Sequence, residues 1–138
     1  MKLLAALLFT LPLLAAEKPQ GTFGLGYTLH HAEEGEFRQW LFVRGVMPGG
    51  AAEKAGVRAQ DLIVAVNGKP LNFADDVALL DFFATIREGD RVKLKLLRGD
   101  ERRDVTVTAA AMTPEQRRLW QQNYEVAKRE QQKRRGRE

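Results

Sequence analysis

The five residues Phe23-Gly24-Leu25-Gly26-Tyr27 constrain the fold more than any other part of the sequence. Glycine allows the backbone to adopt dihedral angles that are costly for other residues and to approach another group closely. Leu25, Tyr27 and Leu29 then alternate with less apolar residues, the period of a half-buried strand. A glycine-rich turn that enters a strand leaves backbone N–H groups in a concave, anion-binding site. The strand edge beside such a site can accept an extended peptide.

The first sixteen residues have the composition of a secretory signal peptide. Met1-Lys2 supplies a positive charge, an apolar run from Leu3 follows, and Ala15-Ala16 ends it. The run is shorter than the ~20 residues that span a bilayer. We therefore expect a signal peptide at 1–16, a polar linker at 17–22, and an exported protein that is periplasmic or secreted. An uncleaved membrane anchor is the alternative.

The sequence contains neither cysteine nor serine. This excludes catalysis by a serine or cysteine nucleophile, whatever the fold. His30 and His31 are the only histidines, and adjacent strand residues point to opposite faces, so these two cannot share a metal ion. We therefore expect no enzymatic activity, no metal site and no cofactor.

The middle of the chain alternates short apolar runs with turn signals. Strands are predicted at 25–31, 40–46, 62–66 and 91–97, with a returning strand through Val105 and Val107. The strand at 40–46 is almost continuously apolar, so we expect it to be buried on both faces. Asn67-Gly68 predicts a two-residue hairpin turn. Helices are predicted at 51–55, ending at Gly56, and at 74–86. The predicted fold is α+β, with a small, partly open antiparallel barrel or sandwich of five to six strands.

A third helix is predicted to begin at Thr113. This residue can cap the helix, Pro114 suits its first position, and Gln116 completes a capping box. Trp120, Tyr124 and Ala127 give the helix one apolar face, with Leu119 and Val126 beside them. The chain beyond Ala127 is polar and cationic, and we expect it to fray.

The positive charge of the protein lies in this C-terminal segment. Residues 113–138 hold eight basic and four acidic residues, whereas residues 17–112 are nearly neutral. The segment could contact an acidic partner or an anionic surface. The favoured interpretation is a solvated helix end whose Trp120 and Tyr124 pack on the domain, because charge runs are usually solvated. Export argues against a nucleic-acid partner.

Several motifs in order resemble the PDZ family, in particular the bacterial, HtrA-like type. Gly24-Leu25-Gly26-Tyr27 is similar to its Gly-Leu-Gly-Phe carboxylate-binding loop. The segments 46–57, 61–71, 89–92 and 97–99 match its further motifs, so that the PDZ-like domain is predicted at 23–110 and a basic helical extension at 113–138. Two departures concern stability: Gly50-Ala51 replaces a capping Ser-Pro, and Gln60 replaces a glycine.

The resemblance implies that a peptide binds between the first strand and the larger helix. The amides of Leu25, Gly26 and Tyr27 would donate to a terminal carboxylate, and charge-assisted hydrogen bonds of this kind are strong. Leu25, Tyr27 and Leu29 would form the floor of an apolar pocket, so the last residue of the ligand is expected to be apolar. Asp75 or Asp76 would accept from a hydroxyl or cation two residues before the ligand's end.

The larger helix carries more apolar residues than a core contact requires. We assign Val77, Leu80 and Ala84 to the core. A second stripe then remains for the wall of the groove, with Leu79 and either Phe82 or Phe83 as the contacts. The alternative is that both phenylalanines are core residues and the groove is narrower.

These features predict a non-enzymatic module that captures C-termini or extended segments of other proteins, as an adaptor, a sensor or a helper of proteolysis. A first alternative is a structural or scaffolding protein that docks through its C-terminal helix. A second is a regulatory subunit of an envelope protease or secretion machine, acting in trans.

Overall fold

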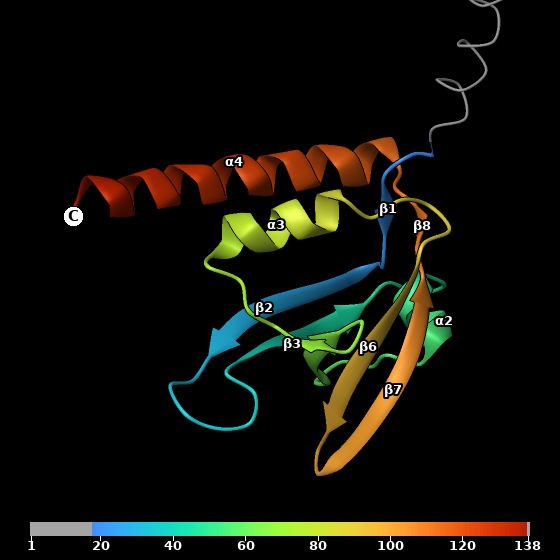
Figure 1. Ribbon diagram of the computed structural model, residues 1–138. Helices are drawn as coiled ribbons and strands as arrows, with labels where there is room; N and C mark the ends of the chain where they lie inside the picture. The colour runs from blue at the N-terminus through green and yellow to red at the C-terminus, as the bar shows by residue number, and fades with distance from the viewer. Residues whose placement is uncertain (1–17, 138) are drawn as a thin grey trace, which may run out of the picture.

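A six-stranded antiparallel sheet forms the centre of the protein, whose residues 18–137 are described by a computed structural model (Figure 1). The predicted signal peptide lies outside the described residues. Five strands follow the order β2-β3-β4-β6-β7, and β5 pairs with β4 at one side of this path. The sheet strands are β2 (Leu25–His31), β3 (Gln39–Val46), β4 (Leu62–Val66), β5 (Lys69–Pro70), β6 (Arg91–Arg98) and β7 (Glu101–Thr108). These strands confirm the predicted α+β class with a partly open antiparallel sheet.

Residues 18–137 form three helices, α2 (Ala51–Ala55), α3 (Asp76–Ala84) and α4 (Pro114–Gly136). The core between sheet and helices is formed by buried apolar residues, among them Leu41, Val43, Ile63, Leu94, Leu96 and Val107. The expectation that β3 is buried on both faces is wrong. Leu41 and Val43 are buried, but Phe42 is only half-buried and Arg44 is exposed on the opposite face.

The predicted turns have the expected backbone conformations. Asn67 and Gly68 have φ angles of 50° and 81°, as a two-residue hairpin turn between β4 and β5 requires. Gly56 ends α2 with a φ of 96° in the left-handed region. These positions show that local turn chemistry sets the path of the chain here.

The segment expected to be a linker takes part in the domain. Gly21–Thr22 forms β1, which pairs with β8 (Ala110–Ala111) in a separate two-stranded sheet. The Gly21 amide donates to the Ile86 carbonyl at 2.8 Å. A Cβ atom at Gly21 would lie 2.8 Å from the Arg87 backbone, so only glycine fits there without a shift.

Helix α4 lies along α3 and extends past it (Figure 1). The predicted capping box is confirmed: the Gln116 amide donates to Thr113 Oγ1 and the Thr113 amide donates to Gln116 Oε1. The predicted fraying beyond Ala127 is not observed, since the helix continues to Gly136. An ion pair between Lys133 and Glu130 and a hydrogen bond from Gln131 to Asp75 support its second half.

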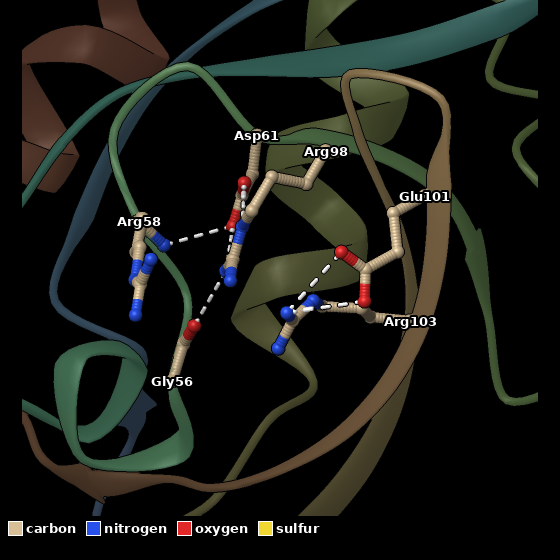
Figure 2. Close-up of polar contacts among 6 residues, drawn as sticks. All are labelled: Gly56, Arg58, Asp61, Arg98, Glu101 and Arg103. Atoms are coloured by element: carbon tan, nitrogen blue, oxygen red, sulfur yellow. Dashed lines mark hydrogen bonds and ion pairs between the residues drawn. The ribbon is translucent and has the colours of Figure 1, made fainter.

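A buried carboxylate joins three segments at the end of the sheet away from α3. Asp61 is 1% exposed and accepts two hydrogen bonds from Arg98, at 2.8 and 2.9 Å, and one from the Arg58 amide (Figure 2). The same guanidinium donates to the Gly56 carbonyl at 2.8 Å. Burial raises the pKa of Asp61, but the bonds from Arg98 and Arg58 outweigh burial and hold the pKa below its ordinary value. The pair fixes the loop between α2 and β4 to β6.

We expect Arg98→Ala to lower the free energy of unfolding by about 3 kcal/mol or more, because it leaves the buried Asp61 carboxylate without its cation. The matched control is Arg103→Ala, whose ion pair with Glu101 (Figure 2) is exposed to solvent, and a loss under about 1 kcal/mol is expected there. Urea unfolding measures both. The stability that Asp61 contributes is present above its unfolded pKa of about 3.9 and is lost as the pH falls through the lower folded value. Equal losses at pH 7 would contradict this account.

We expect Gln60→Gly to stabilise the protein by about 0.5 to 1 kcal/mol. Gln60 has a φ of 75°, in the left-handed region that disfavours residues with a Cβ atom. The neighbouring Ala59→Gly is the control, because Ala59 has no positive φ and the added freedom of the unfolded chain should only destabilise it. Thermal unfolding of both variants gives the sign, and a destabilising Gln60→Gly would show that the strain is absent.

Candidate functional site

Strand β2 lies at an edge of the sheet. In the described part of the chain it pairs only with β3, and its other edge faces α3. A cleft runs along this edge between β2, α3 and α4. Its two parts have volumes of about 550 and 650 Å³. They share the lining residues Leu25, Gly26, Tyr27, Arg44, Leu80 and Asn123, which makes them one continuous groove.

The glycine loop forms one end of this cleft. Gly24 has a φ of 71°, and its carbonyl accepts the Met47 amide at 2.8 Å. The start of α2 packs against the loop, with Gly50 close to both Gly24 and Met47. A Cβ atom on Gly50 would lie 3.1 Å from the Met47 carbonyl oxygen. Gly50 has no side chain with which to cap α2, but the absence of a Cβ atom lets the start of α2 approach Met47 and the glycine loop closely.

Most of the predicted site residues lie together in this cleft. Gly24, Leu25, Gly26, Tyr27 and Leu29 line it from the loop and β2, and Asp76 lines it from α3. Asp75 does not line it. Its carboxylate caps α3 by accepting the Ala78 amide at 2.9 Å and also accepts Gln131 of α4 at 2.8 Å, and these bonds lower its pKa. Peptide contact at any of these residues stays a prediction.

The apolar stripes of α3 are arranged differently from the sequence prediction. Leu79, expected in the groove, is 2% exposed and belongs to the central core, although it reaches the cleft wall. Val77 and Leu80, expected in the core, are buried, but Leu80 also lines both parts of the cleft and Val77 lies beside α4, whereas Ala84 is only half-buried. The reason is that α3 packs against two partners. One apolar stripe of α3, with Leu79, faces the core, and the other, with Val77 and Leu80, faces α4.

The two phenylalanines of α3 have different positions. Phe82 packs against Phe73, with ring centroids 5.7 Å apart, and is not among the residues that line the cleft. Phe83 packs against Phe23 and Tyr27, with ring centroids 6.0 and 5.2 Å apart, and also lines the cleft beside the glycine loop. Phe83 is therefore the phenylalanine that reaches the predicted pocket.

Sequence reasoning missed the contribution of α4. Leu119, Trp120, Asn123 and Val126 line the cleft, together with Met47 from the end of β3. The sequence signal was present, because Leu119 and Val126 are seven residues apart and thus share one helix face. What the sequence could not show was that this face lies over β2.

The described residues 18–137 contain no cluster of three His, Asp or Glu side chains suited to a metal ion. None of the helices among them is long and apolar enough to cross a membrane.

The Tyr27 hydroxyl lies in an apolar and acidic environment. Burial raises its pKa to about 12, and the nearby charge of Asp76 adds to the effect. Between pH 10 and 12 the wild type should lose about 2 kcal/mol of stability, because the unfolded state ionises Tyr27 while the folded state keeps it neutral. We expect Tyr27→Phe to abolish this loss.

Denaturant unfolding of wild type and Tyr27→Phe at pH 8, 10 and 12 measures this difference. Tyr124→Phe, on α4, is the control for loss of a hydroxyl. Parallel stability curves for wild type and Tyr27→Phe up to pH 12 would contradict the raised pKa.

Comparison with known proteins identifies the domain. Residues 42–98 match the PDZ domain family. The periplasmic pH-dependent serine endoprotease DegQ of Escherichia coli K12 is 47% identical over 79 residues, which are 56% of this chain and 17% of that protein. The putative serine protease HhoA of Synechocystis is 40% identical over 72 residues, 52% of this chain and 18% of that protein. The chain thus matches less than a fifth of the length of these relatives.

Solved structures agree on the fold. A serine endoprotease from Yersinia pestis superimposes with a TM-score of 0.51 at 25% identity, covering 81% of this chain and 36% of that one. The HtrA-type protease AlgW, solved with a decapeptide, gives a TM-score of 0.56 at 20% identity, and the match covers 69% of this chain and 30% of that one. These matches confirm the resemblance found in the sequence. The chain thus has a PDZ domain at residues 42–98, and the relatives it matches are proteases of the HtrA and DegQ type.

Proposed function

We propose that this chain captures the C-termini or extended segments of partner proteins by adding them as a strand to β2, beside the loop at Gly24–Tyr27. The observation that carries the proposal is the position of β2: it is an edge strand, it begins in a glycine loop, and it borders an open cleft. PDZ domains bind peptides by strand addition. The AlgW structure was solved with a decapeptide, which supports a peptide as the partner.

The direction of the ligand follows from the direction of β2. A strand that adds antiparallel to β2 places its C-terminus at the start of β2, where the loop lies. The carboxylate would accept amides of Leu25, Gly26 and Tyr27, and the last side chain would enter the space between Leu80, Phe83 and Met47. Burying one apolar side chain there is worth ~1.5–3 kcal/mol, so ligands with an apolar last residue are favoured.

The proposed role is one of recognition rather than chemistry. The chain has no serine or cysteine nucleophile, and a PDZ domain is a binding module. Its relatives DegQ and DegP are named as periplasmic endoproteases. Together with the predicted signal peptide, these names support an exported adaptor, or a regulatory subunit that acts in trans on an envelope protease or secretion machine.

A second candidate is a scaffolding protein that docks through the end of α4. The supporting observations are that α4 extends past α3 (Figure 1) and that the second half of α4 carries the exposed cations Lys128, Arg129, Lys133, Arg134 and Arg135. An acidic protein surface would be the complementary partner. In this case the cleft would not be needed for recruitment.

The test is binding of a C-terminal peptide library to the full chain, each peptide as free acid and as amide. We expect binders with an apolar last residue whose amides bind at least tenfold more weakly. Met47→Asp would place a negative charge beside the ligand carboxylate and weaken binding roughly tenfold, while the neutral Met47→Asn has a much smaller effect. Equal affinity for acids and amides would remove the carboxylate loop from the proposal. Equal affinity of the Asp and Asn variants would place the carboxylate elsewhere.

A further inference from the structure

We propose that α4 is a third wall of the peptide cleft and that one of its faces contacts the bound ligand, which a PDZ groove bounded only by a strand and a helix would not provide. This inference rests on the proposed function, since it concerns the same cleft. We call the face concerned the cleft stripe; it consists of Leu119, Asn123, Val126, Glu130 and Arg134.

The spacing of the cleft stripe makes it one continuous helix face. Its members follow at intervals of four, three, four and four residues, and each lines one or both parts of the cleft. A neighbouring stripe, Gln116, Trp120, Tyr124, Ala127 and Gln131, holds the half-buried residues of the helix. The hydrogen bond from Gln131 to Asp75 and the place of Ala127 beside Val77 show that the C-terminal part of this second stripe packs on α3, while Gln116 and Trp120 at its other end also line the cleft. Packing on α3 thus fixes the rotation that points the cleft stripe at β2.

The exposure of apolar residues indicates what this face is for. The large apolar side chains most exposed in residues 18–137 are Met47, Leu119 and Val126, at 47%, 49% and 56%. All three line the cleft, although they come from different elements. Apolar side chains gathered at one groove are typical of a binding site, whereas single ones scattered over a surface are not. The bound peptide would remove them from water.

The direction of α4 relates its residues to positions in the ligand. Leu119 lies at the end of the cleft that contains Gly24 and Met47, whereas Val126 and Glu130 lie at the end with Leu29 and Asp76. Leu119 and Val126 are seven residues apart, about 10.5 Å along the helix. An extended peptide rises ~3.3 Å per residue, so this distance corresponds to about three residues. The occupant we propose is a partner's C-terminal segment with an apolar last residue and a second apolar residue among the four at its end.

The cleft stays open with α4 in place. Its volumes of about 550 and 650 Å³ lie between the floor of β2 and the cleft stripe, so side chains of α4 do not fill the groove. This favours a wall that adds contacts over a lid that competes with the ligand. The two roles give opposite signs when the stripe is truncated.

The experiment compares Leu119→Ala/Val126→Ala with the control Gln121→Ala/Gln132→Ala, all in the full chain. The control residues are exposed on other faces of α4 and are not among those lining the cleft. Alanine favours helix, so circular dichroism should be unchanged for both. The probe is the tightest free-acid peptide selected on wild type, labelled for fluorescence anisotropy, with its amide beside it. We expect the cleft-stripe variant to bind roughly tenfold more weakly and the control to bind as wild type does.

The outcomes separate this inference from the proposed function. Unchanged affinity with carboxylate dependence retained overturns the third wall and leaves the proposed function standing, and tighter binding shows that α4 obstructs the cleft and also overturns it. Absence of carboxylate-dependent binding in wild type removes both. Trp40→Phe, which leaves Trp120 as the only tryptophan, gives an independent reading. Because Trp120 lines the cleft, the peptide should shift its emission, and unchanged emission would contradict the proposal.

Discussion

The free edge of β2 is the constraint on which the arrangement of the rest depends. A sheet edge presents unpaired backbone groups that must be covered or used. In the described chain β3 pairs with one side of β2, and α3 and α4 flank the other at a distance that leaves a groove. Tyr27 of β2 and Phe83 of α3 pack across this space, with ring centroids 5.2 Å apart. The edge is thus flanked by α3 and α4 but borders an open groove.

The small β1–β8 sheet explains why α4 begins at the glycine loop. Gly21 and Thr22 pair with Ala111 and Ala110, and the Met112 amide donates to the Gln20 carbonyl at 2.9 Å. The residues just before the loop and those just before α4 are therefore held together, although about ninety positions separate them in the sequence. Because α4 starts from this fixed point and packs on α3, its direction along the cleft is determined.

Local features of the fold could be predicted because they depend on neighbouring residues. The hairpin at Asn67-Gly68, the end of α2 at Gly56 and the capping box at Thr113 each follow from short-range backbone chemistry. The roles of Leu79 and Leu80 could not be predicted in the same way. Both are apolar, and which of them faces the core depends on the position of α4, a long-range contact that helix periodicity does not contain. The same limit hid Leu119 and Val126 from the predicted site.

The match to the PDZ family covers residues 42–98, which include α3 and the central strands but neither β2 nor α4. The part of the chain that resembles the family most clearly is therefore the framework and a single wall of the cleft. The glycine loop, the edge strand and the cleft stripe lie on either side of that framework in the sequence and meet only in the fold. Under the proposed function, ligand selectivity would depend mainly on these flanking segments. Substitutions on the cleft face of α4 could then change the preferred peptide while leaving the buried core and the Asp61–Arg98 pair untouched.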